Sequence, residues 1–152
     1  MTDAIEKEVN IRAPRSRVWR AIAERSDFGE WFGVDFAGSG EFRPGETVSG
    51  NLSAEDWKHL AVTIEVVDVV PETNLSFHWH PYAVDVNIDY SAEPMTVVEF
   101  TLEDVAGGTR LRVVESGFDR IPLERRAEAI RMNDGGWAEQ IQNIERYVLT
   151  SV

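Results

Sequence analysis

Two acidic residues stand among apolar neighbours, where a carboxyl group could do chemistry. Glu115 follows Leu111 and Val113 at every second position, so in a strand all three side chains face the same side. A carboxyl group on an apolar inner face could bind the polar end of a ligand or act as a general acid or base. The alternative is an ion pair with an arginine such as Arg12 or Arg20. On the first interpretation, Glu115→Gln changes ligand affinity more than stability.

The second acidic residue, Asp134, lies on a helical stripe where leucine or isoleucine would be expected. The stripe recurs at steps of four and three and contains Leu123, Ala127, Ile130, Asp134, Trp137, Ile141, Ile144 and Val148. Gly135 and Gly136 come next, although a glycine inside a helix costs about 1 kcal/mol relative to alanine. Either the helix breaks here and Asp134 caps a second helical segment, or the helix continues and the glycines keep a cavity open beside Trp137.

A pair of histidines raises the question of a metal site. His78 and His80 are two residues apart in "TNLSFHWHP" and would share one face of a strand. Such a pair needs a third ligand, for which the candidates are His59, Asp85 and Glu99. Leu75, Phe77 and Trp79 form the more apolar face of this strand. We therefore expect the histidines to point away from a cavity, and we predict no metal.

Other catalytic patterns are missing from the sequence. The chain has no cysteine, which excludes disulfides, thiol nucleophiles and thiolate clusters. There is no Gly-x-Ser-x-Gly elbow, no phosphate-binding loop and no convincing dinucleotide fingerprint. Ser116 has no histidine placed in the sequence to activate it. We predict no catalytic residue and no cofactor.

Composition narrows the classes of partner. The net charge of −12 repels nucleic acids and anionic lipid surfaces. No stretch approaches the roughly 18 apolar residues of a membrane span, and the charged N-terminus is unlike a signal peptide. These features predict a cytoplasmic protein. The length of 152 residues predicts a single domain over residues 1–152.

The elements that must position these residues can be predicted from the hydrophobic periodicity. A strand is expected at residues 5–12, and then a helix in "RSRVWRAIAE" and a short helix in "SDFGEWFG". Asp27 and Glu30 resemble a capping box for the second helix, whose buried face would be Phe28, Trp31 and Phe32.

Period-two patterns then predict about five antiparallel strands. They lie in "EFRPGETVSGNL" (strand, Pro-Gly turn, strand), "LAVTIEVVDVVP", "TNLSFHWHP", "MTVVEFTLEDV" and "TRLRVVESGF", the last two joined at Ala106-Gly107-Gly108. The stretch with Tyr82, Asp85, Asp89 and Tyr90 is either a short strand or a connection at a cavity mouth that could act as a lid. A helix over residues 122–149, about 40 Å long, closes the chain.

Several motifs resemble, in order, those of the START-like (SRPBCC) superfamily, in particular the branch related to the activator of the heat-shock chaperone ATPase. The motifs are "FGEWFG", "FRPGE", "LSFHWHP", "GGTRLRVVESGF" and "GGWAEQIQNIERYV", and the resemblance covers about residues 5–148. The resemblance implies an α+β helix-grip fold, in which a bent antiparallel sheet wraps around the C-terminal helix and encloses an apolar cavity. Where many relatives have a histidine before Ser-Gly-Phe, this chain has Glu115.

The resemblance and the periodicity together give a candidate binding site. Its predicted ligand-binding residues are Trp31, Phe77, Trp79, Phe100, Leu102, Leu111, Val113, Glu115, Asp134, Trp137 and Ile141. The preferred hypothesis is binding of a small apolar or aromatic molecule without catalysis. A cyclase- or dehydratase-type enzyme, with Glu115 or Asp134 as acid or base, is the first alternative. A module that binds a chaperone ATPase is the second, and the resemblance alone implies that partner. Homodimer formation is left open.

Overall fold

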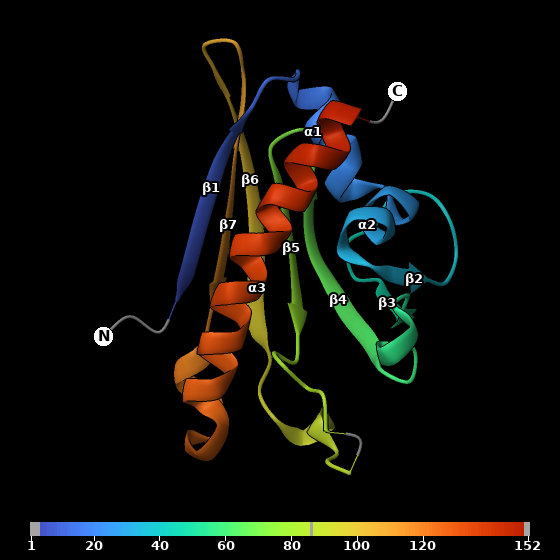
Figure 1. The fold of residues 1–152 in the computed structure, drawn as a ribbon, viewed down its shortest axis with the longest axis vertical. Coiled ribbons are helices and arrows are strands. Elements are labelled where there is room, and N and C mark those ends of the chain that lie inside the picture. The colour runs from blue at the N-terminus through green and yellow to red at the C-terminus, as the bar shows by residue number, and fades with distance from the viewer. Residues whose placement is uncertain (1–3, 86, 151–152) are drawn as a thin grey trace.

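One seven-stranded antiparallel sheet and three α-helices make up the part of the chain described by the computed structural model, residues 4–85 and 87–150 (Figure 1). The helices are α1 (Arg15–Ala23), α2 (Arg25–Phe32) and α3 (Leu123–Thr150), and short 3-10 turns are η1 (Glu55–Trp57), η2 (Tyr90–Ala92) and η3 (Phe118–Arg120). The strands are β1 (Ile5–Ile11), β2 (Val34–Phe36), β3 (Thr47–Leu52), β4 (Ala61–Val70), β5 (Asn74–Trp79), β6 (Thr96–Val105) and β7 (Gly108–Ser116).

The order of the strands places the first beside the last. It is β1-β7-β6-β5-β4-β3-β2, with antiparallel pairing throughout and a bulge in β4 between Val66 and Asp68. In β7, alternate residues from Thr109 to Glu115 are buried while those between them are at least partly exposed. This alternation identifies the inner face of the sheet.

Helix α3 covers that inner face. Figure 1 shows it crossing the sheet diagonally, with α1 and α2 beside its C-terminal half. Its buried side chains are Ala129, Trp137, Ile141, Ile144 and Val148. The helix is continuous through Asp134, Gly135 and Gly136, so of the two alternatives the unbroken helix is confirmed. The molecule therefore has the predicted α+β helix-grip architecture.

Most predicted elements are present with small shifts in their bounds. Both bounds lie within two residues of the prediction for five elements: β1, α1, β4, β5 and α3. The predicted hairpin between β6 and β7 is confirmed, since Val105 pairs with Gly108 across Ala106 and Gly107, which has φ 81°. Such a positive φ suits glycine at little steric cost.

Two local predictions are wrong, and one short strand was not predicted. α2 begins at Arg25, so Asp27 lies within its first turn and does not cap it. The short edge strand β2, which pairs with β3, was not predicted, because three residues are too few to show a period. The segment before the Pro-Gly turn forms only an isolated bridge, from Glu41 to Glu24. Between β5 and β6, the described residues form a connection with η2 and no strand.

Among the described residues, no helix has both the length and the apolar character needed to cross a membrane.

Candidate functional site

The centre of the candidate site is a buried carboxylate with four hydrogen-bond donors. The Glu115 side chain has 0% exposure. Its Oε2 accepts from Trp79 Nε1 at 2.7 Å and from Thr96 Oγ1 at 2.6 Å. Its Oε1 accepts from Asn133 Nδ2 and Trp137 Nε1, both at 2.9 Å. The predicted ion pair with Arg12 or Arg20 is wrong, since all four partners are neutral.

Sheet register and helix phase together assemble this cluster. Trp79 on β5 lies directly opposite Thr96 on β6, and Glu115 lies on β7, the next strand of the sheet. α3 contributes Asn133 and Trp137, which are four residues apart and so lie on one face of the helix. Three strands and one helix therefore meet at one carboxyl group, which makes its position depend on the whole fold.

The two tryptophans of the cluster also pack on each other. Their ring centroids are 5.7 Å apart and their planes differ by 30°. Phe32, at the end of α2, meets the ring of Trp79 at 5.9 Å and that of Trp137 at 6.5 Å. Offset or tilted ring pairs of this kind add about 0.5–1.5 kcal/mol beyond burial. The indole N–H groups are thus directed at the carboxylate while the ring faces form an apolar wall.

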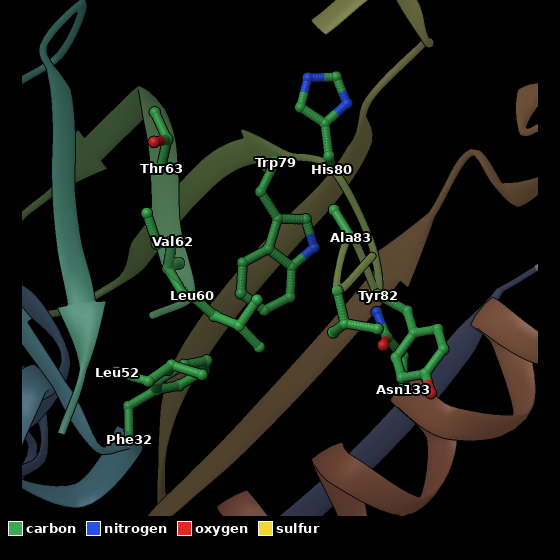
Figure 2. Close-up of a pocket in the computed structure, with 12 residues that line it drawn as sticks. Phe32, Leu52, Leu60, Val62, Thr63, Trp79, His80, Tyr82, Ala83 and Asn133 are labelled. Atoms are coloured by element: carbon green, nitrogen blue, oxygen red, sulfur yellow. The ribbon is translucent and has the colours of Figure 1, made fainter. Parts of the chain in front are cut away.

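A cavity of about 250 Å3 lies beside Trp79 (Figure 2). Figure 2 shows Leu60 just below the ring of Trp79, Phe32 and Leu52 farther to the lower left, and Tyr82 and Asn133 to the lower right. The residues that line the cavity are mostly apolar: Phe32, Leu52, Leu60, Ala61, Val62, Thr63, Trp79, His80, Tyr82, Ala83, Val84 and Asn133. A mostly apolar wall with a few polar groups is typical of small-molecule sites.

A smaller cavity of about 120 Å3 adjoins the first. It shares Phe32, Trp79 and Asn133 with the larger cavity and adds Gly136, Trp137 and Gln140. A Cβ placed on Gly136 would meet no atom within 4 Å, so the space beside this glycine is open. Gly136 is itself exposed, so this open space faces solvent as well as the cavity, and the role of a glycine in keeping room beside Trp137 stays a prediction. Gly135 is exposed and has open space around it in the same way, but it lines neither cavity, whereas Gly136, although exposed, lines the smaller one.

His80 lies at the rim of the larger cavity. It comes directly after the last residue of β5, so the strand alternation no longer fixes its direction. Figure 2 shows its imidazole directed away from the ring of Trp79. Its Nδ1 is buried and has no hydrogen-bond partner among the described residues. Burial lowers the pKa of His80 below its usual value, which favours the neutral ring at physiological pH. Within residues 4–85 and 87–150, no group of three or more His, Asp or Glu side chains could hold a metal ion.

The connection between β5 and β6, which contains Tyr82, is bound to the start of α3 through Arg125. Arg125 Nη1 donates to the carbonyl oxygen of Pro81 at 2.9 Å, and its Nη2 lies 2.7 Å from the Glu93 carboxylate. The Arg125 guanidinium also lies over the ring of Tyr90, 4.8 Å from its centroid. Tyr82 itself has φ 48°, in the left-handed region that side chains other than glycine rarely adopt. One arginine thus holds a strained part of the cavity wall.

The inward orientation predicted for Asp134 is wrong. Its side chain is 53% exposed and its Oδ1 lies 3.1 Å from Lys7 Nζ on β1. At about 100° per residue, Asn133 and Asp134 lie about 40° and 60° from the direction of Trp137, on opposite sides. Asn133 is the closer of the two and occupies the inner position. Leu123, at the start of the predicted stripe, is also exposed, at 76%.

The remaining predicted ligand-binding residues are in the hydrophobic core. None of them lines either cavity, and their relative exposure is at most 6%: Trp31, Phe77, Phe100, Leu102, Leu111, Val113 and Ile141. Of the predicted set, Trp79 and Trp137 line a cavity and Glu115 lies behind both. Asn133 and Thr96 were not predicted as partners of Glu115, because a single polar residue on an apolar face carries no signal of its partner.

The fold and the site together define a helix-grip protein with a mostly apolar cavity lined by residues of β3–β5 and the connection after β5, to which α3 contributes Asn133. The family described as activator of Hsp90 ATPase homolog 1-like protein matches residues 12–149. The chain belongs to this family. A search of curated proteins finds no match to the sequence.

Solved structures share the fold at low sequence identity. A protein from Mesorhizobium loti is 26% identical, with a TM-score of 0.74 and a match that covers 98% of both chains. A protein from Arthrobacter aurescens is 15% identical, with a TM-score of 0.78 over 97% of this chain and 87% of the other. The Aha1 dimer from Colwellia psychrerythraea is 16% identical, with a TM-score of 0.69 over 95% of each chain. At such identities the last two show a common fold alone.

Proposed function

We propose that this protein binds a small, largely apolar or aromatic molecule in the cavity beside Trp79. The observation that carries the proposal is a cavity of about 250 Å3 whose wall is mostly apolar and contains the rings of Phe32, Trp79 and Tyr82. Ligand sites typically measure roughly 300–1,000 Å3, so the occupant is small, of one or two rings. The Glu115 hydrogen bonds fix the Trp79 ring, which supports a preformed site.

The enzyme alternative finds less support than binding. Glu115 is fully buried and each of its oxygens already accepts two hydrogen bonds, so no lone pair is left for a substrate proton. Asp134 lies outside both cavities, in an exposed ion pair with Lys7. A general acid or base must reach the proton that it transfers.

Native mass spectrometry on gently purified protein, combined with a thermal-shift screen of small aromatic compounds, tests the binding proposal. Hits are then titrated against Gly136→Leu, which adds a side chain at the smaller cavity, whose wall shares Phe32, Trp79 and Asn133 with the proposed binding cavity. The matched control is Gly135→Leu, which adds the same side chain at an equally exposed glycine that lines neither cavity. We expect at least tenfold weaker binding for Gly136→Leu and unchanged binding for Gly135→Leu. The absence of any adduct and of any melting shift would contradict ligand binding.

A second candidate function is regulation of a chaperone ATPase. It is favoured by the family description and by the fold shared with the Aha1 dimer from Colwellia psychrerythraea. The direct test is stimulation of the chaperone ATPase by the purified chain. Analytical ultracentrifugation over a range of concentrations tests for a homodimer. ATPase stimulation without any small-molecule binding would favour this candidate over the first.

A further inference from the structure

The charge of Glu115 is not balanced by a cation within its cluster of described residues. Two indole N–H groups, an amide and a hydroxyl point at its oxygens, and this set of donors matches an ionised carboxylate, which only accepts. A buried charge of this kind is little screened by water. Because Trp79 and Asn133 contact the carboxylate and also line the larger cavity, the negative charge lies one side chain behind the cavity wall.

The described lining of the larger cavity contains no cation to offset this field. None of its residues is a lysine or arginine, and the pKa of His80 is lowered by burial, which favours the neutral imidazole. Arg125 contacts the backbone beside the cavity, but its guanidinium is paired with the Glu93 carboxylate at 2.7 Å. Walls of low dielectric concentrate the field of the nearby charge within the cleft. The cavity is therefore electronegative as well as apolar.

The aromatic rings of the cavity wall also favour a positively charged ligand. Trp79, Phe32 and Tyr82 line the cavity, and tryptophan is the best ring for a cation–π contact. The Trp79 N–H donates to an anion at 2.7 Å, which pushes electron density into the indole and makes its face more negative. Trp79 stacks on Trp137 and also lines the cavity, so a ligand there would meet this ring.

We propose that the ligand carries a positive charge, as a quaternary ammonium or protonated amine on an apolar or aromatic body, and that the cavity discriminates against anions. This inference rests on the proposed binding function and specifies its ligand class. The cationic head packs on the ring of Trp79 in the field of Glu115, without touching the buried carboxylate. Carboxylate ligands such as fatty acids are disfavoured by the same field.

The test compares three probes of similar shape and different charge: phenyltrimethylammonium, its neutral isostere tert-butylbenzene, and the phenyltrifluoroborate anion. Dissociation constants come from the NMR shifts of the indole N–H resonances of Trp79 and Trp137. We expect the cation to bind about tenfold or more tightly than the neutral probe, and the anion to bind more weakly than either. Equal or tighter binding of the neutral probe would overturn the charge preference and leave apolar binding intact. If no probe binds but the aromatic screen gives hits, the charge inference fails alone, and if both fail, so does the binding proposal.

High salt distinguishes cation binding at the cavity from the general attraction of cations to the acidic surface. The net charge of −12 attracts any cation to the surface, but about 1 M salt shortens the Debye length to about 3 Å and removes that attraction. A site-specific preference persists at this salt concentration, whereas its loss there would overturn the proposal. Glu115→Gln, where it folds, removes the preference. Glu99→Gln, which neutralises an exposed glutamate on neighbouring β6, preserves it. The main test is the ratio of the dissociation constants of the neutral and cationic probes for the wild-type protein. It can therefore be made even if Glu115→Gln does not fold.

Discussion

Trp79 and Trp137 stack with their ring centroids 5.7 Å apart, and their indole nitrogens donate to different oxygens of one carboxylate. The first residue ends β5 and the second lies in the middle of α3. Glu115 therefore acts as a bridge that fixes helix and sheet at one separation and one rotation. The two rings form part of the apolar cavity wall, and their hydrogen bonds to the Glu115 carboxylate fix their orientation.

Glu115→Gln tests the structural importance of this bridge. A glutamine offers one oxygen and an NH2 group, so the donors on the other side lose their acceptor and face a donor instead. Each unpaired buried donor costs roughly 1–3 kcal/mol. We expect the free energy of unfolding, measured by urea denaturation, to fall by about 3 kcal/mol. This reverses the expectation from sequence that affinity would change more than stability.

The control for Glu115→Gln is Glu103→Gln, which breaks a surface ion pair with Arg110 on the adjacent strand. Exposed pairs contribute about 0–1 kcal/mol, so the control loses at most that amount. If both variants lose the same free energy of unfolding, the four hydrogen bonds to Glu115 stabilise the fold no more than an exposed ion pair does.

The adjacent residues Asn133 and Asp134 provide a test of the helix phase. Asn133→Asp replaces a donor to Glu115 by a second carboxylate at the same place, which adds like-charge repulsion in a buried site. We expect the free energy of unfolding at neutral pH to fall by about 3 kcal/mol, with part of the loss recovered as acid protonates the new group. Asp134→Asn removes one half-exposed ion pair with Lys7 and costs less than about 1 kcal/mol. A larger loss for Asp134→Asn would place Asp134 on the inner face after all.

The paired glycines of α3 should give equal gains in stability when each is replaced by alanine. Both lie inside a continuous helix, and a Cβ at either meets no atom within 4 Å. Alanine is favoured over glycine in a helix by about 1 kcal/mol. Gly135→Ala and Gly136→Ala are therefore each expected to raise the free energy of unfolding by about 0.5–1 kcal/mol in denaturant titrations. A loss at Gly136 would mean that the neighbouring rings leave no room there.

Periodicity predicted the sheet, the long helix and the inner face of β7, because burial on one side repeats over many residues. It placed Glu115 inside correctly for the same reason. It could not select the partners of Glu115, since four neutral donors from three other elements leave no mark in the local sequence. It also misplaced Asp134, because positions three and four residues before Trp137 both belong to one helical face, and small differences in phase decide between them. Which aromatic residues line a cavity, and which fill the core, depends on packing across elements.

Arg125→Ala should release the connection between β5 and β6. The arginine binds the carbonyl oxygen of Pro81, pairs with Glu93 and covers the ring of Tyr90, with both partners of the ion pair largely buried. We expect hydrogen exchange to accelerate in residues 81–85 and 90–95, and the free energy of unfolding to fall by about 2 kcal/mol. Arg126→Ala is the matched control, because Arg126 binds carbonyl oxygens of Asp119 and Ile121 outside this connection. Equal exchange in both variants would contradict the role of Arg125.

Tyr147 gives the fold a dependence on alkaline pH. Burial and its hydrogen bond to the Asp27 carboxylate raise the pKa of Tyr147 to about 12, from an ordinary value of about 10. A raised pKa in the folded state means that Tyr147 stabilises the fold fully below about pH 10, and that this contribution is lost as the pH rises toward about 12. Tyr147→Phe should therefore melt several degrees below the wild type at about pH 8, and the difference should narrow between about pH 10 and 12. Thermal melts of both proteins across this range measure it, with Tyr90→Phe as the control for tyrosine removal. A constant difference over the whole range would show that the Tyr147–Asp27 hydrogen bond is not the cause.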